Sequence, residues 1–231
     1  MILILKQINK FGKLNKMSDM EQQLINFQFD KSYKSDDFYV SKSNFFAFSL
    51  LDSWPKWEKN ILNIHGEKYS GKSHLSEIFL KKNKGIILKA SDLDPNYVKS
   101  LRFHENIVLD DLNKNIDEKL LFSLINFVDQ NSKFLIINSS MPLNKIKFKL
   151  KDLQSRSKFI LEAKIEKPDD ELINVLITKN LSDKQIKIDN KLVEFAVKRI
   201  TRSYGKIFEF IYKIDEISLK KKKSIDQKTI K

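Results

Sequence analysis

The chain contains no cysteine, so disulfide bonds, thiolate metal sites and thiol nucleophiles are all excluded. Its three histidines, His65, His74 and His104, show no spacing typical of metal ligands. An apolar run near the start covers only residues 2–5, which is too short for a secretory signal or a membrane span. We therefore expect a cytoplasmic protein with no membrane association and no structural metal site. Met17 and Met20 are alternative translation starts to Met1.

Arginine is scarce: only four of the 43 basic residues are arginine, and the others are lysine. The net charge of +13 over 231 residues favours nucleic-acid partners in general. However, the lysines are spread along the whole chain and form a dense run only at residues 220–223. We interpret the charge as a solvated basic face that also reflects a lysine-rich coding bias. Weak DNA binding through phosphate contacts is the alternative.

Glycine is also rare, and two of the five glycines, Gly66 and Gly71, frame the most specific motif of the chain. Residues 66–73 read G-E-K-Y-S-G-K-S and match the phosphate-loop pattern G-x-x-x-x-G-K-[ST]. An apolar segment at residues 61–65 precedes the loop and is expected to form a strand, and a helix is expected to begin at Ser73. The backbone N–H groups of such a loop and the helix dipole together attract phosphate.

This motif predicts the binding of a nucleoside di- or triphosphate, with ADP or ATP and Mg²⁺ as the expected cofactors. Lys72 is expected to reach the β- and γ-phosphates, and the Ser73 hydroxyl to ligate Mg²⁺. The alternative is a glycine turn before an ordinary helix.

Strand-like and helix-like segments alternate beyond this loop, which is typical of a parallel sheet with flanking helices. After a helix that ends near Trp54 and Pro55, and the first strand at 61–65, further strands are expected at residues 86–88, 106–111, 134–138 and 159–161. The helices between them are expected to begin near Asp94 and to cover residues 117–129 and 144–153. After Pro168 the pattern is helical only, at residues 169–180, 190–201 and 204–218.

The sequence therefore predicts three parts. Residues 1–36 are a flexible tail, residues 37–166 an α/β domain with a five-stranded parallel sheet, and residues 167–231 a small helical lid.

Polar residues follow two of the expected strands at the edge where ligands of parallel sheets bind. Asp110 and Asp111 end the strand at 106–111, and Asn138 ends the strand at 134–138. We expect Asp110 to hold Mg²⁺ through water. Asp111 is expected to orient the attacking water, although it is one methylene shorter than glutamate, and Asn138 to lie between the water and the γ-phosphate. The alternative is that the two acids only cap a turn.

Arg156 stands out as one of the four arginines, between a basic helix and the last expected strand. In this position it is a candidate arginine finger, supplied in trans to the nucleotide site of a neighbouring molecule. The alternative is a helix-end arginine that pairs with carbonyl groups or with Asp152.

From about Gln22 onward, the chain resembles the AAA+ module of the DnaA/Hda family and is most similar to the Hda-like regulators of the replication initiator DnaA. The resemblance rests on the pair Asp110-Asp111 and on residues 37–44, 54–57, 66–74 and 150–156. It implies a P-loop AAA+ fold and a protein that favours ADP, stimulates ATP hydrolysis by DnaA through its arginine finger, and so inhibits re-initiation.

The resemblance also implies the partners and further site residues. Residues 22–29 are similar to a motif that binds the sliding clamp (the β subunit of DNA polymerase III), and the residues concerned are Gln23, Leu24, Phe27 and Phe29. On the nucleotide side, the resemblance implies that Phe38, Val40, Asn44 and His74 line the site.

One position departs from the family pattern. Gly205 stands where the family has a lid arginine, and Lys206 beside it is expected to replace the phosphate contact. Together with the short Asp111, this departure predicts weak ATPase activity of the chain itself. No helix-turn-helix domain like that of DnaA is expected before the chain ends at Lys231.

Two further hypotheses stay open. The first is a self-sufficient ATPase that works as a homo-oligomer in DNA loading or remodelling, and its turnover would rise with protein concentration. The second is a DNA-binding module, which would bind DNA tightly without the clamp and with a steep salt dependence.

Overall fold

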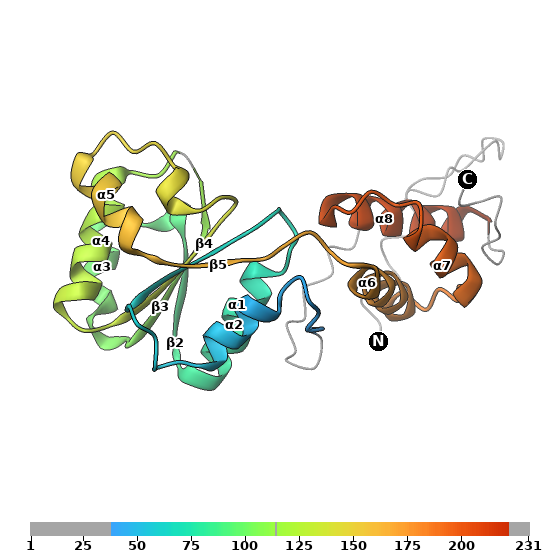
Figure 1. Ribbon diagram of the computed structural model, residues 1–231, viewed down its shortest axis with the longest axis horizontal. Coiled ribbons are helices and arrows are strands. Elements are labelled where there is room, and N and C mark those ends of the chain that lie inside the picture. The colour runs from blue at the N-terminus through green and yellow to red at the C-terminus, as the bar shows by residue number, and fades with distance from the viewer. Residues whose placement is uncertain (1–37, 114, 222–231) are drawn as a thin grey trace, which may run out of the picture. The chain divides into compact units, whose positions relative to one another are not determined.

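Five parallel strands form a single sheet in the computed structural model, which describes residues 38–113 and 115–221. The strand order is β2-β3-β4-β1-β5, and each neighbouring pair is parallel (Figure 1). The strands are β1 (Ile61–His65), β2 (Gly85–Lys89), β3 (Asn106–Leu112), β4 (Phe134–Ser139) and β5 (Leu161–Lys164). All five residues of β1 are buried, as expected for a central strand covered on both faces. The predicted α/β class with a five-stranded parallel sheet is therefore confirmed.

Helices cover both faces of this sheet (Figure 1). One face packs against α1 (Phe45–Asp52) and α2 (Lys72–Asn83), and the other against α3 (Pro95–Ser100), α4 (Glu118–Gln130) and α5 (Lys151–Arg156). Because strand side chains alternate, Val108 enters the cluster beneath α2 while its neighbours Ile107 and Leu109 enter the cluster beneath α4. The two faces of the sheet therefore have separate hydrophobic cores.

A third hydrophobic cluster lies among the last three helices. They are α6 (Asp170–Asp183), α7 (Asn190–Val197) and α8 (Tyr204–Lys221). The side chain of Asp169 accepts a hydrogen bond from the backbone N–H of Leu172 and so caps the N-terminus of α6. Tyr204 at the start of α8 is 2% exposed and packs with the α1–α2 cluster, so these helices are joined to the sheet domain. The boundary between residues 166 and 167 stays a prediction.

Three of the expected elements were wrong in extent. The last strand covers Leu161–Lys164 rather than residues 159–161, because a short 3₁₀ turn at Ser157–Phe159 precedes it and leaves Phe159 exposed. The helix expected at residues 144–153 is only α5, from Lys151. Before α5 the backbone N–H groups of Lys149 and Leu150 donate to the Glu118 carboxylate instead of to helix carbonyls. The helix expected at residues 190–201 already ends at Val197.

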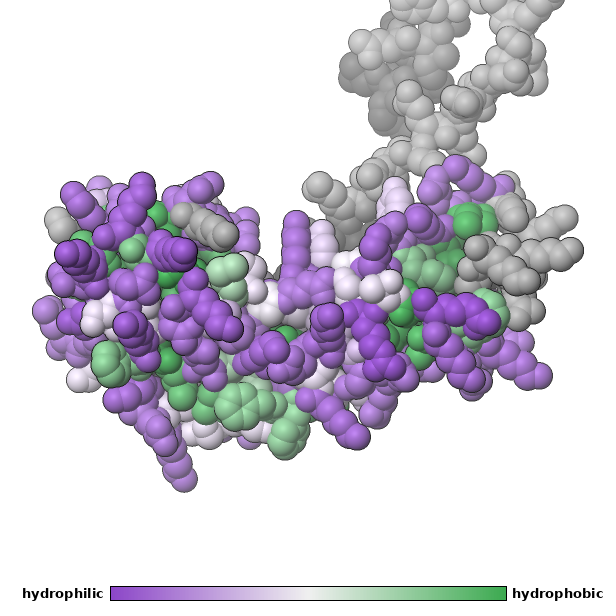
Figure 2. Space-filling model, turned by 45° about the horizontal axis from the view of Figure 1, so that its top comes forward, coloured by the Kyte–Doolittle hydropathy of each residue, from purple (hydrophilic) through white to green (hydrophobic). Residues whose placement is uncertain are grey.

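The surface is consistent with the even spread of lysine along the sequence. Hydrophilic side chains predominate over the face shown in Figure 2, with apolar patches between them. Phe45 and Phe46 of α1 are 61% and 59% exposed. Within residues 38–113 and 115–221, no helix is both long enough and apolar enough to cross a membrane.

Candidate functional site

The glycine loop joins the end of β1 to the start of α2, where the sequence predicts it. Gly71 is the N-cap of α2 and has a φ of 92°, a left-handed conformation that favours glycine. A Cβ atom at Gly66 would lie 2.9 Å from the carbonyl oxygen of Ile165, so the backbone passes too closely there for a side chain. Both glycines of the motif are therefore required by the local geometry.

The Lys72 ammonium group lies inside this loop. Its Nζ donates to the carbonyl oxygens of Gly66 and Glu67 at 3.0 and 2.9 Å, and to the Ser70 hydroxyl at 3.4 Å. Burial lowers the pKa of Lys72, whereas the nearby carboxylates of Asp110, Asp111 and Glu67 act to raise it. A partly buried cation held by neutral carbonyl groups is well placed to exchange them for phosphate oxygens.

The paired acids lie in a β-bulge at the end of β3. Leu109 pairs with Ile137 of β4, but the next pair is Leu112 with Ser139, so β3 has one more residue than its partner over this step. Within the bulge Asp111 has a φ of 57° and is exposed. Such a left-handed conformation is tolerated by aspartate more readily than by most residues.

Four side chains from three elements form a continuous hydrogen-bonded network at the sheet edge. The Ser73 hydroxyl donates to Asp110 Oδ1 at 3.0 Å, and the Asn138 amide donates to the same oxygen at 2.8 Å. Asn138 Nδ2 also donates to the Ser76 hydroxyl at 2.9 Å, and this hydroxyl lies 3.2 Å from Asn138 Oδ1, to which it can donate. The structure therefore brings together Ser73, Asp110 and Asn138, three of the residues singled out in the sequence.

Ser76 was missed by the sequence reasoning. It is 0% exposed and lies on α2, three residues after Ser73 and four after Lys72. This spacing places the three side chains on one face of the helix, and it is the only signal in the sequence that pointed to Ser76. Its hydroxyl contacts both the nitrogen and the oxygen of the Asn138 amide, whose nitrogen also donates to Asp110.

Ser76→Ala is expected to destabilise the fold by about 1–3 kcal/mol, because it leaves the buried Asn138 amide with an unsatisfied oxygen. Ser140→Ala, at an exposed serine directly after β4, is the control and should leave stability unchanged. The free energy of unfolding in urea measures both variants. Equal stability of the two variants would contradict this role.

The segment before α1 lies against the loop. The Phe38 ring meets the His74 ring edge-on at 5.4 Å, and a Cβ atom at Gly71 would approach Phe38 to 3.2 Å. Asn44 is 3% exposed and uses its amide locally: it accepts from the backbone N–H of Ser41 and donates to the carbonyl of Tyr39. Phe38 and His74 thus lie at the loop, and Asn44 supports the segment that carries Phe38. Val40 is half-buried in this segment.

Lys206 does not contact the loop. Its ammonium is exposed and pairs with Glu209 one turn later at 2.8 Å, and this hydrogen bond raises the pKa of Lys206. Glu67 of the loop contacts the start of α8, because it accepts hydrogen bonds from Ser203 and from the backbone N–H of Tyr204.

Arg156 lies at the end of α5, on the face of the sheet opposite to α2. Its guanidinium pairs with Asp129 at 2.8 Å and stacks over the Phe122 ring, with 5.5 Å to the ring centroid. The partner is therefore Asp129 of α4, not Asp152 as the alternative interpretation expected. The structure does not bring Arg156 together with the Lys72 cluster, and a finger that acts in trans does not require this.

Gln23, Leu24, Phe27 and Phe29 lie outside the described residues.

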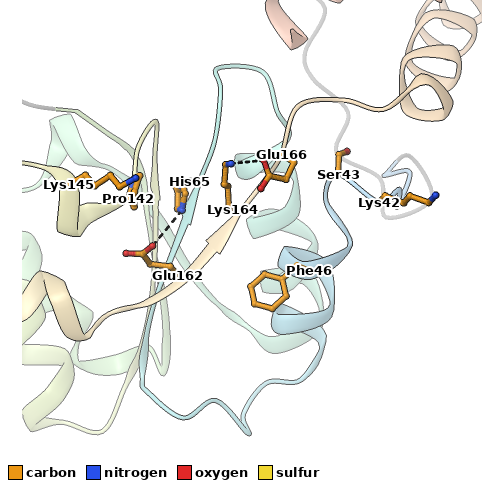
Figure 3. Close-up of a pocket in the computed structure, with 9 residues that line it drawn as sticks. All are labelled: Lys42, Ser43, Phe46, His65, Pro142, Lys145, Glu162, Lys164 and Glu166. Atoms are coloured by element: carbon orange, nitrogen blue, oxygen red, sulfur yellow. Dashed lines mark ion pairs between the residues drawn. The ribbon is translucent and has the colours of Figure 1, made fainter. Parts of the chain in front are cut away.

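A cavity of about 390 Å³ lies beside the ends of β1 and β5 and includes none of the predicted site residues. Figure 3 shows an ion pair between Lys164 and Glu166 at 2.6 Å, and a contact of 3.9 Å between His65 and Glu162 that is an ion pair only when His65 is protonated. Burial and the nearby Lys164 lower the pKa of His65. Because the carboxylates of Glu162 and Glu166 also line this cavity and would repel an anion, it is a weaker candidate for a phosphate site than the glycine loop.

The part of the chain that the structure describes contains no group of three or more His, Cys, Asp or Glu side chains that could hold a metal ion alone. This is compatible with the predicted Mg²⁺ role, because Mg²⁺ often takes only one or two protein ligands and completes its shell with water and phosphate oxygens.

No protein-family model matches the chain. Among solved structures, domain III of the replication initiation protein DnaA from Thermotoga maritima is similar, with a TM-score of 0.69 and 20% identity over 86% of this chain and 93% of that one. AMPPCP-bound DnaA from Aquifex aeolicus has a TM-score of 0.65 and 18% identity over 82% of this chain and 68% of that one. A RuvB variant from Thermotoga maritima has a TM-score of 0.64 and 15% identity over 88% and 71%. The chain shares the α/β fold of these proteins, a five-stranded parallel sheet with flanking helices.

Proposed function

We propose that this chain is a nucleotide-binding AAA+ protein of DNA replication, which binds ADP or ATP with Mg²⁺ at the glycine loop. The observation that carries the proposal is the convergence of Lys72, Ser73, Asp110 and Asn138 at one edge of the parallel sheet. A cation, a hydroxyl, a carboxylate and an amide in this arrangement match the phosphate and the metal ion of a Mg²⁺–nucleotide.

The residues present fit this cofactor. Gly66 and Gly71 avoid side chains that would crowd the loop at the N-terminus of α2, where backbone N–H groups favour phosphate. Ser73 and Asp110, 3.0 Å apart, would hold Mg²⁺, the aspartate through water. Bound Mg²⁺ would neutralise charge on the phosphates. Phe38 and His74 provide aromatic surface beside the loop for the base or ribose.

The similarity to solved structures of DnaA supports the proposed role of this chain in DNA replication. One similar structure is the replication initiator DnaA bound to AMPPCP and single-stranded DNA.

The nucleotide proposal is tested by calorimetric titration of the purified chain with ADP and with ATP, each with and without Mg²⁺. We expect saturable binding of both nucleotides. The absence of heat with either would overturn the proposal.

The finer function that we propose is regulation of DnaA. Arg156 is 45% exposed on the surface of α5, so its guanidinium can enter a partner's nucleotide site once it leaves Asp129. A guanidinium supplied in trans stabilises charge on the transferring phosphoryl group. The chain would thereby stimulate ATP hydrolysis by DnaA and inhibit re-initiation, with DNA contacted indirectly or weakly. Its own ATPase activity would be weak, because the exposed Asp111 is short for orienting water.

We also propose that Gln23, Leu24, Phe27 and Phe29 bind the sliding clamp, as the resemblance implies. The variant Leu24→Ala/Phe27→Ala is expected to lose clamp binding by a factor of about 100, because two apolar anchors are removed from one short motif. The measurement is retention on immobilised clamp by surface plasmon resonance. Leu5→Ala/Phe11→Ala, a matched pair earlier in the chain, is the control. Equal retention of both double variants would contradict the proposed binding of the clamp by Leu24 and Phe27.

A self-sufficient homo-oligomeric ATPase is the second candidate function. The complete polar set at the sheet edge favours it, because Ser73, Asp110 and Asn138 would serve hydrolysis within the chain's own assembly. Intrinsic turnover that rises steeply with protein concentration, without DnaA or clamp, would favour this candidate over the regulator.

A further inference from the structure

The side chain of Glu67, the second residue of the glycine loop, contacts the start of α8, far away in the sequence. One carboxylate oxygen accepts from the Ser203 hydroxyl, and the other accepts from the backbone N–H of Tyr204 at 3.2 Å. Tyr204 is the first residue of α8, so Glu67 supplies a hydrogen-bond acceptor to a backbone donor that has no partner within the helix.

A second contact joins the same two segments. The ring of Tyr69, also in the loop, packs against the ring of Phe208 one turn further along α8, with 5.6 Å between the centroids. Gly205 lies between these contacts, and a Cβ atom there would approach Glu67 Oε1 to 3.8 Å. The loop therefore contacts the first two turns of α8, through one polar and one aromatic contact.

The polar contact has the chemistry of an anion bound at a helix N-terminus. The partial positive charge of a helix N-terminus attracts anions, and here the anion is a carboxylate of the chain itself. The carbonyl oxygen of the same residue accepts from Lys72 Nζ at 2.9 Å. The backbone carbonyl of Glu67 thus contacts the Lys72 ammonium, and the side chain of Glu67 contacts the first turn of α8.

We propose that Glu67 is a positioning residue that acts as an internal anionic ligand of the α8 N-terminus and docks this helix on the glycine loop before any nucleotide binds. The backbone N–H of Tyr204, at the N-terminus of α8, already donates to Glu67. It therefore needs no phosphate oxygen of a nucleotide as its acceptor. The position of α8 is then set by the chain and responds little to whether ADP or ATP is present.

The inference concerns the same site as the proposed function, but its main test needs no nucleotide. Amide hydrogen exchange, followed residue by residue by NMR on the full chain, reports the Tyr204 N–H directly. In Glu67→Ala the exchange rate of this amide is expected to rise about tenfold, because it loses a charge-assisted acceptor. Glu67→Gln keeps an acceptor without the charge and should give a rise of about threefold.

Glu58→Ala is the matched control, because Glu58 is an exposed carboxylate in the segment before β1. This variant should leave the exchange of the Tyr204 amide as in the parent protein. Exchange at Tyr204 that is unchanged in Glu67→Ala would overturn the proposal, because Glu67 would then not hold the helix.

Nucleotide provides the second arm of the test. In the parent protein, ADP and ATP are each expected to change the exchange rate of the Tyr204 amide by less than about twofold. Protection that arises only after nucleotide is added would also overturn the proposal. If calorimetry finds no nucleotide binding but Glu67→Ala still releases the amide, the proposed function fails and this inference stands.

Discussion

Lys72→Ala is expected to weaken the binding of ADP and ATP by about 100-fold or more, which corresponds to about 2.7 kcal/mol. The physical reason is the loss of a charge-assisted donor to the phosphates, in a partly buried position where water compensates poorly. The affinity is measured by isothermal titration calorimetry in the presence of Mg²⁺. The fold should persist, because Lys72 contacts only the loop through the hydrogen bonds of its Nζ.

Lys68→Ala is the matched control within the same loop. The Lys68 ammonium lies over the Tyr69 ring at 5.1 Å from the centroid, away from the loop carbonyl groups that Lys72 contacts. Its removal should change the affinity by no more than about threefold, the effect of one exposed charge. Equal losses in the two variants would mean that net positive charge, rather than the Lys72 geometry, attracts the nucleotide. Parent-like binding by Lys72→Ala would refute the assignment of the site.

Arg156→Ala is expected to abolish the stimulation of ATP hydrolysis by DnaA while leaving nucleotide binding by the chain intact. An arginine finger in trans accelerates phosphoryl transfer by about 10³–10⁵-fold, so its loss should return DnaA to its basal rate. Nucleotide binding should persist because Arg156 packs on the face of the sheet opposite to α2. The measurement is phosphate release from ATP-loaded DnaA with clamp, DNA and the purified chain.

Two variants separate this role from a structural one. Arg102→Ala removes another exposed arginine that stacks on a phenylalanine ring, at 5.0 Å from the centroid, and should keep full stimulation. Asp129→Asn breaks the ion pair of Arg156 but keeps the guanidinium, so stimulation should be retained or increased. Loss of stimulation in Asp129→Asn would indicate that the α4–α5 ion pair, and not a free arginine, is what the partner needs.

Much of the fold could be predicted from local pattern. The runs at residues 61–65, 106–111 and 134–138 are apolar enough to be buried on both faces of a sheet, and they are strands in the structure. The segment at residues 146–150 could not be predicted in this way. It is rich in lysine and apolar residues, as a helix would be, but the distant Glu118 takes its backbone N–H groups. Such a long-range acceptor leaves no signal in the local sequence.

The sequence likewise predicted some residues of the candidate site and missed others. The motif spacing was sufficient to place Lys72 and Ser73 in the loop, and strand ends were sufficient to place Asp110 and Asn138 at the same edge. The spacing did not reveal Ser76, because a serine within a helix is usually a surface residue. Nor did it reveal the bulge that holds Asp111 in a left-handed conformation, since a bulge depends on the register with β4.

What the sequence alone determined is therefore local: the glycine loop, the order of strands and helices along the chain, and the exclusion of cysteine chemistry. These follow from residue types at short spacings, where backbone geometry allows few choices. Tertiary structure alone decided which distant groups meet, as when Glu67 reaches Tyr204 and Arg156 pairs with Asp129. The reason is physical: these contacts depend on how packed elements cross in space, and neither partner's neighbours in the sequence specify that crossing.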